Sequence, residues 1–597
     1  MLRHLTALFF LFAPLVPAPL GGAQESCNTG VINRIVVENR SIFAEEDIPE
    51  QGRLRWAYLL ANRVHIRTRE EFIRQSLFLL EEGDCLDPAA LAETARLLRE
   101  YRFLAGAEIA AVEGPGGGWD VHVETRDEWT TKLAVDVHFD DGIRMEGFSL
   151  VQENFLGRGA TVGVFGLDRD ERREAGMTVE VPGVLGSGLD VRSELQRTRI
   201  GDAAELAIVR PFRVELPGRA FRHVASYRKD YFSYVLPGHS RYSHAVIPVT
   251  EQRLELSAAE RFNDPGDLYL LGGGLSLERL EVGPGDELGG VVGRDFSELE
   301  MATPEMEQAI ANQLRPRRAV RLNLLLGLRK LEFETRQGLD AVAGVQDLAV
   351  GREVKMTLGR SLGGTVDGHP QDLFTRLDLF GGRSGGRTVA QLHISGEGRR
   401  EDSGTASVGW SDLLLESHAF LYWIRDGALS NTWVLRGAVH SGWRTRSPFQ
   451  LSLGGPDGVR GYDELDFPGA HRTVLSAEGR FRLPGPFSEL ADFGLTAFGD
   501  LGASWAGDAP FGVDSGWRGS LGAGLRIGFP AGSSSVIRAD VAFPVGSGAS
   551  SRSPVIRISA REWIGVTGAF RSPQFERSRG AGIRAEYRGV AREPSIP

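Results

Sequence analysis

The sequence predicts a mostly β fold, in which one small α+β domain precedes a large antiparallel transmembrane β-barrel. Three observations support this prediction: an export signal at the start, helical periodicity in the region that follows it, and alternating apolar and polar residues through most of the remaining chain. With 597 residues, the chain is long enough for two or more domains.

The first residues have the pattern of a secretory signal peptide. A positively charged start precedes an apolar run at 5–20 and small residues at 21–23, so we expect residues 1–23 to be removed after Ala23. The alternative is a lipoprotein signal on Cys27. It is disfavoured because residues 24–26 are polar where a lipobox is apolar.

The composition narrows the fold class. Glycine is abundant, with 76 residues, and no later stretch is apolar for the roughly 18 residues that a transmembrane helix needs. An exported chain of this kind is typical of an all-β protein, either a secreted sandwich or a membrane barrel. The net charge of −11 argues against nucleic acid as a partner.

Alternation in the last third of the chain favours the barrel. Five segments place apolar residues on one face and at least one charged residue on the other, over about ten residues each. They are 473–483, 495–503, 521–529, 536–545 and 555–563, with Glu478, Asp500, Arg526, Arg538 and Arg557 among the charged residues. A large soluble β protein, with its charges facing water, is the alternative.

Alternation begins much earlier, at 131–139. Candidate strands over 129–563 number about twenty, which indicates a large barrel without fixing the number, because such counts over-split long strands. We therefore assign 128–564 to the barrel and 565–597 to a C-terminal tail. Residues 583–588 alternate weakly, so a further strand there remains an alternative.

The region before the barrel, 24–127, predicts a small independent domain with helices on one face of a sheet. The expected order is strand, helix, helix, strand, strand. The segments are 31–38, 70–81, a helix that begins at Asp87-Pro88 and runs to about 101, 106–112 and 119–126. Cys27 and Cys85 are the two cysteines of the chain, and an oxidising compartment favours pairing them. The alternative is two separate buried thiols.

Several motifs resemble those of one known family of membrane barrels. The strongest match is Gly-Gly-Pro-Asp-Gly-Val-Arg-Gly-Tyr at 454–462, and Phe-Gly-Asp-Leu-Gly at 498–502 resembles the wall strand whose aspartate meets that arginine. Residues 153–159 resemble the first hairpin turn of such barrels. The element order of 24–127, with Arg-Glu-Tyr-Arg-Phe-Leu at 99–104, resembles a POTRA domain. On these motifs the chain resembles the BamA/TamA-type outer-membrane protein assembly superfamily (bacterial surface antigen barrels with a POTRA domain).

The resemblance implies a sixteen-stranded barrel in the outer membrane of a diderm bacterium, with the POTRA-like domain in the periplasm. Members insert or translocate β-rich proteins, so the implied partners are unfolded outer-membrane or secreted proteins, outer-membrane lipid and periplasmic assembly factors. This chain has one POTRA-like domain where the main assembly factors have several, and it continues past its last alternating strand. An accessory transporter is therefore as consistent with the sequence as an essential assembly factor.

The motif also has a physical interpretation. The segment 442–471 is long for a hairpin connection, and such loops are usually functional or disordered. Arg460 of this loop could pair with Asp500 and Glu478 on the lumen face of the wall, because a guanidinium binds carboxylates in bidentate fashion. The alternative is a flexible external loop. The predicted motif residues are Gly454, Gly455, Val459, Arg460, Gly461 and Tyr462.

The sequence does not predict an enzyme. Gly359–Gly363 matches a nucleophile-elbow pattern, with Asp367 and His369 downstream, but the elbow requires a strand-to-helix turn in an α/β sheet. No His-Glu-x-x-His, paired Cys-x-x-Cys or P-loop pattern occurs, so no metal or cofactor is expected. The remaining alternatives are a passive porin and a structural or adhesive surface barrel. The latter would use exposed loops such as 282–317, where Thr303-Pro304 predicts a helix start.

Overall fold

The computed structural model describes residues 27–559, with gaps, and residues 572–576. The gaps are residue 28, 44–47, 49–54, 140–142, 170–171, 239–240, 284–286, 293–297, 363–370, 403–408, 426–430, 485–488 and 547–552. The predicted signal peptide and the weakly alternating segment 583–588 lie outside the described residues.

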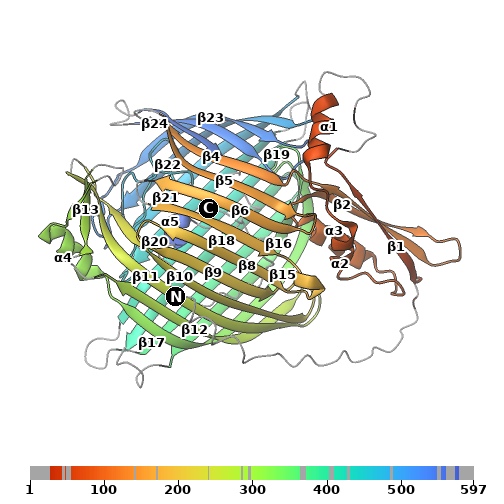
Figure 1. Cartoon of the computed structure of the whole chain (residues 1–597), viewed down its shortest axis with the longest axis horizontal. Helices are drawn as coiled ribbons and strands as arrows, with labels where there is room; N and C mark the ends of the chain where they lie inside the picture. The colour runs from red at the N-terminus through yellow and green to blue at the C-terminus, as the bar shows by residue number, and fades with distance from the viewer. Residues whose placement is uncertain are drawn as a thin grey trace.

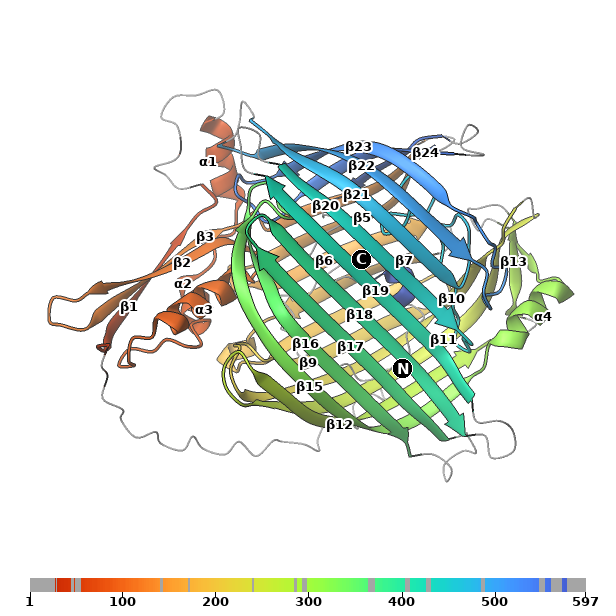
Figure 2. The ribbon, with the colours of Figure 1, turned by 180° about the vertical axis from the view of Figure 1, so that it is seen from behind.

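A small N-terminal domain lies at one mouth of a large barrel (Figures 1 and 2). Its elements are β1 (Ile32–Arg40), α1 (Arg55–Val64), α2 (Glu70–Gln75), α3 (Pro88–Arg99), β2 (Leu104–Glu113) and β3 (Trp119–Asp127). The sheet order is β1-β3-β2, with β1 parallel and β2 antiparallel to β3. One core of apolar side chains, which includes Ile73, Leu98 and Val123, joins α2 and α3 to this sheet.

Two details of this domain differ from the predicted elements. The helix expected over 70–81 ends at Gln75, although Leu77 and Leu80 after it still pack into the core from a turn. Helix α1 was not predicted. Asp87 caps α3 by accepting from the backbone N–H of Ala89 at 2.9 Å, as its position before Pro88 predicts. A disulfide joins Cys27 and Cys85, whose Cα atoms are 5.3 Å apart.

Among the described residues, the barrel wall has twenty strands, β4–β12 and β15–β25. Their bounds are β4 Thr131–Phe139, β5 Ile143–Phe155, β6 Ala160–Arg169, β7 Arg172–Val181, β8 Asp190–Thr198, β9 Asp202–Arg210, β10 Gly218–Val235, β11 Tyr242–Phe262, β12 Leu268–Val282, β15 Arg317–Gln337, β16 Val345–Ser361, β17 Gln371–Gly385, β18 Thr388–Asp402, β19 Gly409–Arg425, β20 Asn431–Trp443, β21 His471–Leu483, β22 Asp492–Trp505, β23 Arg518–Gly528, β24 Ile537–Val545 and β25 Val555–Ser559. A 3-10 turn, η2 (Val184–Gly186), joins β7 to β8.

The expectation of sixteen strands is therefore wrong. That number came from the motif resemblance, and the motifs describe one loop and the wall beside it, which leaves the rest of the circumference undetermined. Nine of the described wall strands precede residue 283, and several of them, such as β8 and β9, are short and joined by tight turns. Short strands consume fewer residues, so the same length of chain supplies more of them.

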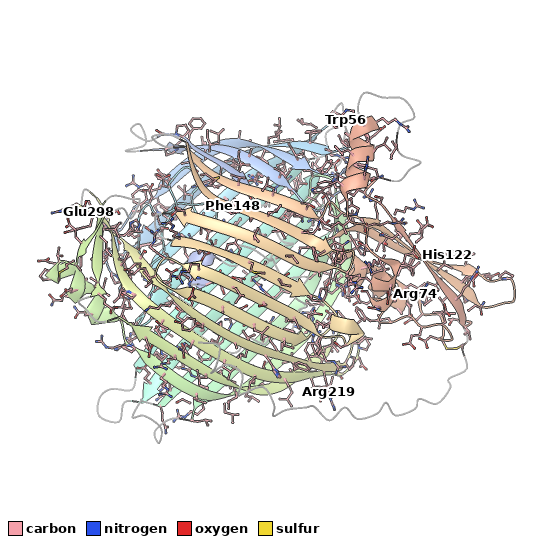
Figure 3. All side chains as sticks on the ribbon, in the orientation of Figure 1. Trp56, Arg74, His122, Phe148, Arg219 and Glu298 are labelled. Carbon is pink, nitrogen blue, oxygen red and sulfur yellow. A yellow bond between two sulfur atoms is a disulfide. The ribbon has the colours of Figure 1, made fainter. Side chains whose placement is uncertain are left out.

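The outer face of the wall is apolar. Leu475, Leu495, Leu521 and Phe543 are exposed there, on the faces that the sequence alternation assigned to lipid. Figure 3 shows Phe148 on the same outer wall, between Glu298 at one end of the molecule and His122 at the other. Such a large apolar surface is typical of a barrel that lies in lipid.

Exposed tryptophans mark the height of this apolar band. Trp433 and Trp443 lie near the two ends of β20 and are 43% and 41% exposed. Ten residues of strand span about 34 Å, which corresponds to a band of about 25 Å at the usual tilt of barrel strands. The two tryptophans are therefore placed where aromatic girdles meet the membrane–water interfaces.

After β12 the chain forms additional elements at the mouth opposite the N-terminal domain (Figure 1). It contains β13 (Gly289–Val292), β14 (Glu298–Met301) and α4 (Pro304–Gln313), and β13 extends the sheet by pairing with the end of β11. Thr303 caps α4, as Thr303-Pro304 predicts. No helix in the described part of the chain is long and apolar enough to cross a membrane.

The N-terminal domain contacts the barrel through the hairpin turn between β5 and β6. Asn154 donates to the Thr68 hydroxyl at 2.7 Å, and the Arg69 backbone N–H donates to the Gly157 carbonyl at 2.9 Å. A bidentate ion pair at 2.9 Å between Arg99 of α3 and Asp347 of β16 adds a second attachment. The turn at 153–159, predicted from the resemblance as the first hairpin turn, is thus a part of the barrel that the N-terminal domain contacts.

Candidate functional site: the lumenal loop and its wall

The segment 444–470 between β20 and β21 folds into the barrel. A short antiparallel bridge joins Leu451 and Gly469, and the turn is packed by a buried cluster that contains Leu453, Val459 and Tyr462. Val474 of β21 completes this cluster from the wall. The loop therefore has a core of its own, shared with the wall, and is not an external loop.

Arg460 uses its whole guanidinium on two wall carboxylates. Its Nε and Nη2 donate to the two oxygens of Asp500 at 2.9 and 2.8 Å, and its Nη1 donates to Glu478 Oε2 at 2.8 Å. The Arg460 backbone N–H also donates to Asp500 at 3.1 Å. The ring of Phe498 lies 3.5 Å from the Arg460 Cζ, so the cation is covered on one face by an aromatic ring.

More charges surround this pair than the sequence analysis predicted. Arg538 donates to Glu478 Oε2 at 2.7 Å and to Asp540 at 2.8 Å, and Arg480 donates to Glu478 Oε1 at 2.8 Å. Glu478 thus accepts from three arginines, Arg460 being the third. Alternation placed all of these side chains on the lumen face, but the cross-strand distances depend on register, which the sequence does not state.

Close approach of the backbone explains two glycines of the motif. A Cβ on Gly461 would lie 2.6 Å from the Cβ of Ser520 and 3.0 Å from the backbone of Phe543, so this residue must be small for the loop to reach the wall. A Cβ on Gly458 would lie 2.0 Å from the Leu453 carbonyl oxygen. The loop can place Arg460 between the carboxylates only with both positions unsubstituted.

The motif is also held by the last strand. Arg557 of β25 donates to the carbonyl of Arg460 at 2.6 Å and to the carbonyl of Tyr462 at 3.0 Å. Strand β25 lies next to β4 and closes the barrel. The loop tip is therefore bonded directly to β25, the strand that lies next to β4 where the barrel closes.

A second buried ion network lies elsewhere on the lumen wall. Glu278 of β12 accepts from Arg321 of β15 and Arg399 of β18, both at 2.7 Å. Arg321 also donates to Asp372 of β17 at 2.8 Å. No local pattern in the sequence predicts this network, because each strand shows only an isolated charge and the partners are on strands far apart in the chain.

A turn at the domain-side mouth adds further contacts in the lumen. Residues 338–344 join β15 to β16, and Leu339 and Asp340 are buried. The Tyr422 hydroxyl donates to Asp340 at 2.7 Å, and Arg480 donates to the same carboxylate at 3.2 Å. Arg480 thus links this turn to Glu478, and through it to Arg460.

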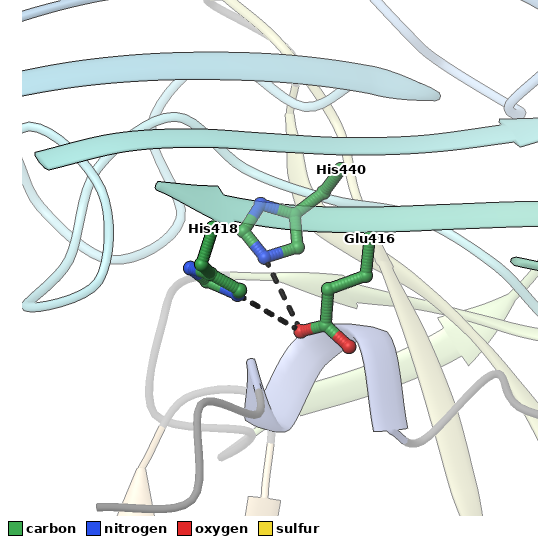
Figure 4. Close-up of side chains that lie close together, drawn as sticks. All are labelled: Glu416, His418 and His440. Carbon is green, nitrogen blue, oxygen red and sulfur yellow. Dashed lines mark hydrogen bonds and ion pairs between the residues drawn. The ribbon is translucent and has the colours of Figure 1, made fainter. Parts of the chain in front are cut away.

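Two histidines and a glutamate converge on the lumen face of β19 and β20 (Figure 4). Glu416 Oε1 lies 3.3 Å from His418 Nε2 and 3.5 Å from His440 Nε2. This set resembles a metal-ligand group, but the Arg472 guanidinium lies 3.2 Å from His440 Nδ1, which must therefore accept a hydrogen bond. A neutral His440 then carries its proton on Nε2, facing Glu416, which favours a hydrogen-bonded chain over a metal site.

Residues 359–361 of the nucleophile-like pattern belong to strand β16 of the wall. Ser361 ends strand β16, and its hydroxyl accepts from the backbone N–H of Asp372 at 2.7 Å. Gly363, Asp367 and His369 lie outside the described residues.

The predicted site residues are thus gathered at one place: Gly454 and Gly455 form the turn, Val459 and Tyr462 fill its core, and Arg460 lies between Glu478 and Asp500. Four residues of the site were missed: Arg480, Arg538, Asp540 and Arg557. For Arg538, Asp540 and Arg557 the sequence did offer a signal, since each lies on the charged face of 536–545 or 555–563.

Comparisons with known proteins return similar barrels. No protein-family model matches the chain, and no curated protein matches it in sequence. Among solved structures, it is similar to BamA from Haemophilus ducreyi lacking POTRA domains 1–3, with 12% identity, 88% of this chain and 84% of that chain covered, and a TM-score of 0.33. It is similar to CdiB from Escherichia coli, with 12% identity, 92% and 93% covered, and a TM-score of 0.37. It is also similar to OccK2 (OpdF) from Pseudomonas aeruginosa, with 11% identity, 72% and 94% covered, and a TM-score of 0.28.

Proposed function

We propose that this chain is an outer-membrane barrel of the BamA/TamA type that inserts or translocates β-rich proteins without enzymatic chemistry. The observation that carries this proposal is the Arg460 contact set. A lumenal loop is fixed by Arg460 to Glu478 and Asp500, and its backbone is held by Arg557 of the closing strand. A passive pore has no need for a loop that links the lumen to the seam.

The seam between β25 and β4 is the joint that such a machine would open. Strand β25, on one side of this seam, spans the five described residues Val555–Ser559, whereas the neighbours β10 and β11 pair over the whole of Gly218–Val235. A strand of that length forms few hydrogen bonds across the seam. Opening it would expose unpaired N–H and C=O groups that can template an incoming strand.

The N-terminal domain supports the same function. Its strand–helix–helix–strand–strand order, with α1 added, resembles a POTRA domain, and β2 is an edge strand paired only with β3 among the described strands. An edge strand can bind an extended client segment by β-augmentation. We therefore propose that this domain lies in the periplasm and binds unfolded outer-membrane or secreted proteins, or periplasmic assembly partners.

The proposal is tested by locking the seam. Cysteine pairs are scanned between outward positions of β4 (Leu133, Val135) and of β25 (Ile556, Ile558), and the crosslinked protein is reconstituted in phospholipid vesicles. The probe is a urea-unfolded eight-stranded outer-membrane barrel, and the readout is its folded, heat-modifiable band. The matched control is the pair Leu521→Cys/Phe543→Cys, which faces outward from directly paired positions of β23 and β24.

We expect the unmodified protein and the control pair to accelerate client folding, and the locked seam to abolish that acceleration until reductant is added. Unmodified protein treated with reductant controls for reduction of the Cys27–Cys85 bond. Full activity of the locked seam, together with loss of activity in Arg460→Ala, would replace the lateral route by secretion through the lumen. Client folding no faster than in protein-free vesicles, with translocation also absent, would overturn the proposal.

A further inference from the structure

Five residues of the C-terminal tail, 572–576, bind inside the barrel. Residues 572–576, which contain the one-turn helix α5 (Pro573–Glu576), lie beside Glu416 of β19 (Figure 4) and contact Ser452 of the inward-folded loop. The side chains of Ser572, Gln574 and Phe575 are all buried. A tail that merely extended from the last strand would not be expected to bury a hydroxyl, a carboxamide and an aromatic ring together.

The carboxamide of Gln574 forms a reciprocal pair with Ser452 of the loop. Gln574 Nε2 donates to the Ser452 hydroxyl at 2.6 Å, and the Ser452 backbone N–H donates to Gln574 Oε1 at 3.0 Å. The same Nε2 lies 3.4 Å from the carbonyl of Glu464. Both ends of the side chain are used, so a carboxylate in its place would lose its donors and add a buried charge.

The ring of Phe575 fills an apolar pocket. Its neighbours are Phe449, Leu451 and Ala470 of the loop, Leu414 of β19, and Ala509. The Phe449 ring is edge-on at 6.1 Å, and the side chain of Phe575 is fully buried. Without this ring, the loop and the wall would enclose a cavity of the kind that destabilises a protein core.

The backbone before these two residues is also recognised. The Ser572 N–H donates to Glu416 Oε1 at 3.2 Å, and Arg472 donates to the Ser572 hydroxyl at 3.3 Å. Glu416 is the carboxylate on which His418 and His440 converge, so this cluster serves as an acceptor for the tail. The wall and the loop thus contact three groups in order along the tail: the backbone of Ser572, the carboxamide of Gln574 and the ring of Phe575.

We infer that residues 572–576 are an intramolecular ligand of a peptide-binding site formed by the lumenal loop and the wall, and that this site accepts a short peptide in which a carboxamide side chain precedes an aromatic ring. The loop is then held on two sides, by the Arg460 carboxylates and by the tail. Peptide binding at this site requires no transport of a client protein.

The test uses a fluorescein-labelled peptide with the sequence of residues 570–578, Phe-Arg-Ser-Pro-Gln-Phe-Glu-Arg-Ser. Binding is measured by anisotropy to the full chain, to a variant that ends at residue 571, and to a matched control that ends at residue 576 and keeps the bound segment. We expect the variant ending at 571 to bind at least tenfold more tightly than the other two. Peptides with the changes Gln574→Glu or Phe575→Ala should lose at least tenfold in affinity.

Equal binding to all three proteins, or equal binding of the Phe575→Ala peptide, would overturn the inference. If the variant that ends at 571 fails to give a heat-modifiable folded band, the full-length Phe575→Ala protein replaces it as the vacated form. Independently, Ser452→Cys/Gln574→Cys in the full chain should form a disulfide detectable by mass spectrometry, and this protein should not bind the peptide. Absence of that crosslink in the folded protein would place the tail elsewhere and refute the site.

Discussion

At the scale of single residues, Arg460 is a tightly constrained side chain of the lumen. It is 3% exposed and is bonded to two carboxylates, and the arginines Arg480 and Arg538 compete for one of them. Buried ion pairs contribute little net stability compared with an apolar replacement, but breaking one leaves an uncompensated charge. A single substitution of Arg460 should therefore lower the free energy of unfolding.

We therefore predict strong coupling between Arg460 and Asp500. Arg460→Ala and Asp500→Ala should each lower the free energy of unfolding by about 3–5 kcal/mol, because each leaves the partner charge buried. The double variant should lose much less than the sum of the two. Urea unfolding in detergent, followed by tryptophan fluorescence, measures all three.

The control for this cycle is the exposed pair Arg197–Asp202, whose nitrogen and oxygen are 2.8 Å apart. Its alanine variants should change stability by only about 0–1 kcal/mol. Additive losses for Arg460 and Asp500 would show that the two side chains act independently, contrary to the geometry.

A second residue, Glu128, predicts a pH dependence at the junction of domain and barrel. Burial raises its pKa to about 7 from 4.5, although Lys132 and a hydrogen bond from Ser533 oppose the shift. Because the folded pKa is the higher one, its stabilisation is complete below about pH 4.5 and is lost as pH rises through about 7. We expect the protein to lose about 2–3 kcal/mol of unfolding free energy from this group between pH 5 and 8.

Glu128→Gln should remove that part of the pH dependence, since an amide stays neutral and can still accept from Ser533. Unfolding midpoints in urea at pH 5, 6, 7 and 8 measure it. Glu124→Gln, which alters an exposed carboxylate of β3, should leave the profile of the parent unchanged. A parent protein whose midpoint is flat across this range would contradict the shifted pKa.

The central residues of the site, Arg460, Glu478 and Asp500, could be predicted from the sequence because a recognisable motif and strand alternation identify them. Alternation is a local property, so it assigned Glu478 and Asp500 to the lumen face correctly. The network of Glu278 with Arg321 and Arg399 depends instead on which strands are neighbours and in what register, and no local pattern contains that information.

At the scale of elements, α1 differs from the other helices of the N-terminal domain. Its buried residues Tyr58 and Ala61 belong to a cluster, separate from the domain core, that joins Phe43 to Trp129 and Phe529 of the barrel junction. We predict that the soluble fragment 24–127 folds cooperatively on its own, but with α1 unprotected. Hydrogen exchange should be slow in β1, α3 and β3 and fast over Arg55–Val64, and protected amides in α1 of the isolated fragment would contradict this division.

The disulfide predicts the response of the same fragment to reduction. The bond closes a loop with a sequence separation of 58 between Cys27 and Cys85. Its removal should lower the unfolding free energy by about 4 kcal/mol on the loop-entropy estimate. The comparison is thermal unfolding of the fragment with and without reductant, with Cys85→Ser as an unreactive control that should match the reduced form.

The sequence identified α3 from its Asp-Pro start, and three strands from alternation, whereas it did not identify α1. The buried side chains of 55–64 pack with Ile42 and Phe43 and with residues of the barrel junction, all of them distant from the helix in the sequence. Elements that are stabilised by a distant partner have weak local signals.

At the scale of the whole molecule, the strand number was the largest error. Direct reading of the alternation gave about twenty candidates, while the resemblance implied sixteen, and the wall has twenty strands in the described residues. Local periodicity thus counted strands better than motif similarity did. A motif constrains the residues around one loop and leaves the circumference free.

A wider barrel with a filled lumen predicts low conductance. Twenty strands would enclose an aqueous channel if the interior were empty, but 444–470, 338–344 and 572–576 all lie inside. We expect ion conductance in planar bilayers to be small, and to rise several-fold when 447–468 is replaced by Gly-Ser-Gly. Shortening the distant turn 114–118 should have no effect, and a large conductance in the unmodified protein would favour a passive porin.

The even number of antiparallel strands in the described wall has a kinetic consequence. It brings the start of β4 and the end of β25 to the same mouth, where three residues, Glu128–Thr130, connect the N-terminal domain to β4. Those residues reach at most about 10 Å. A polypeptide held by the domain would therefore meet the closing strands as an intramolecular partner, at an effective concentration of about millimolar. Weak and rapidly reversible capture would then suffice for delivery, and the domain would gain nothing from binding its cargo tightly.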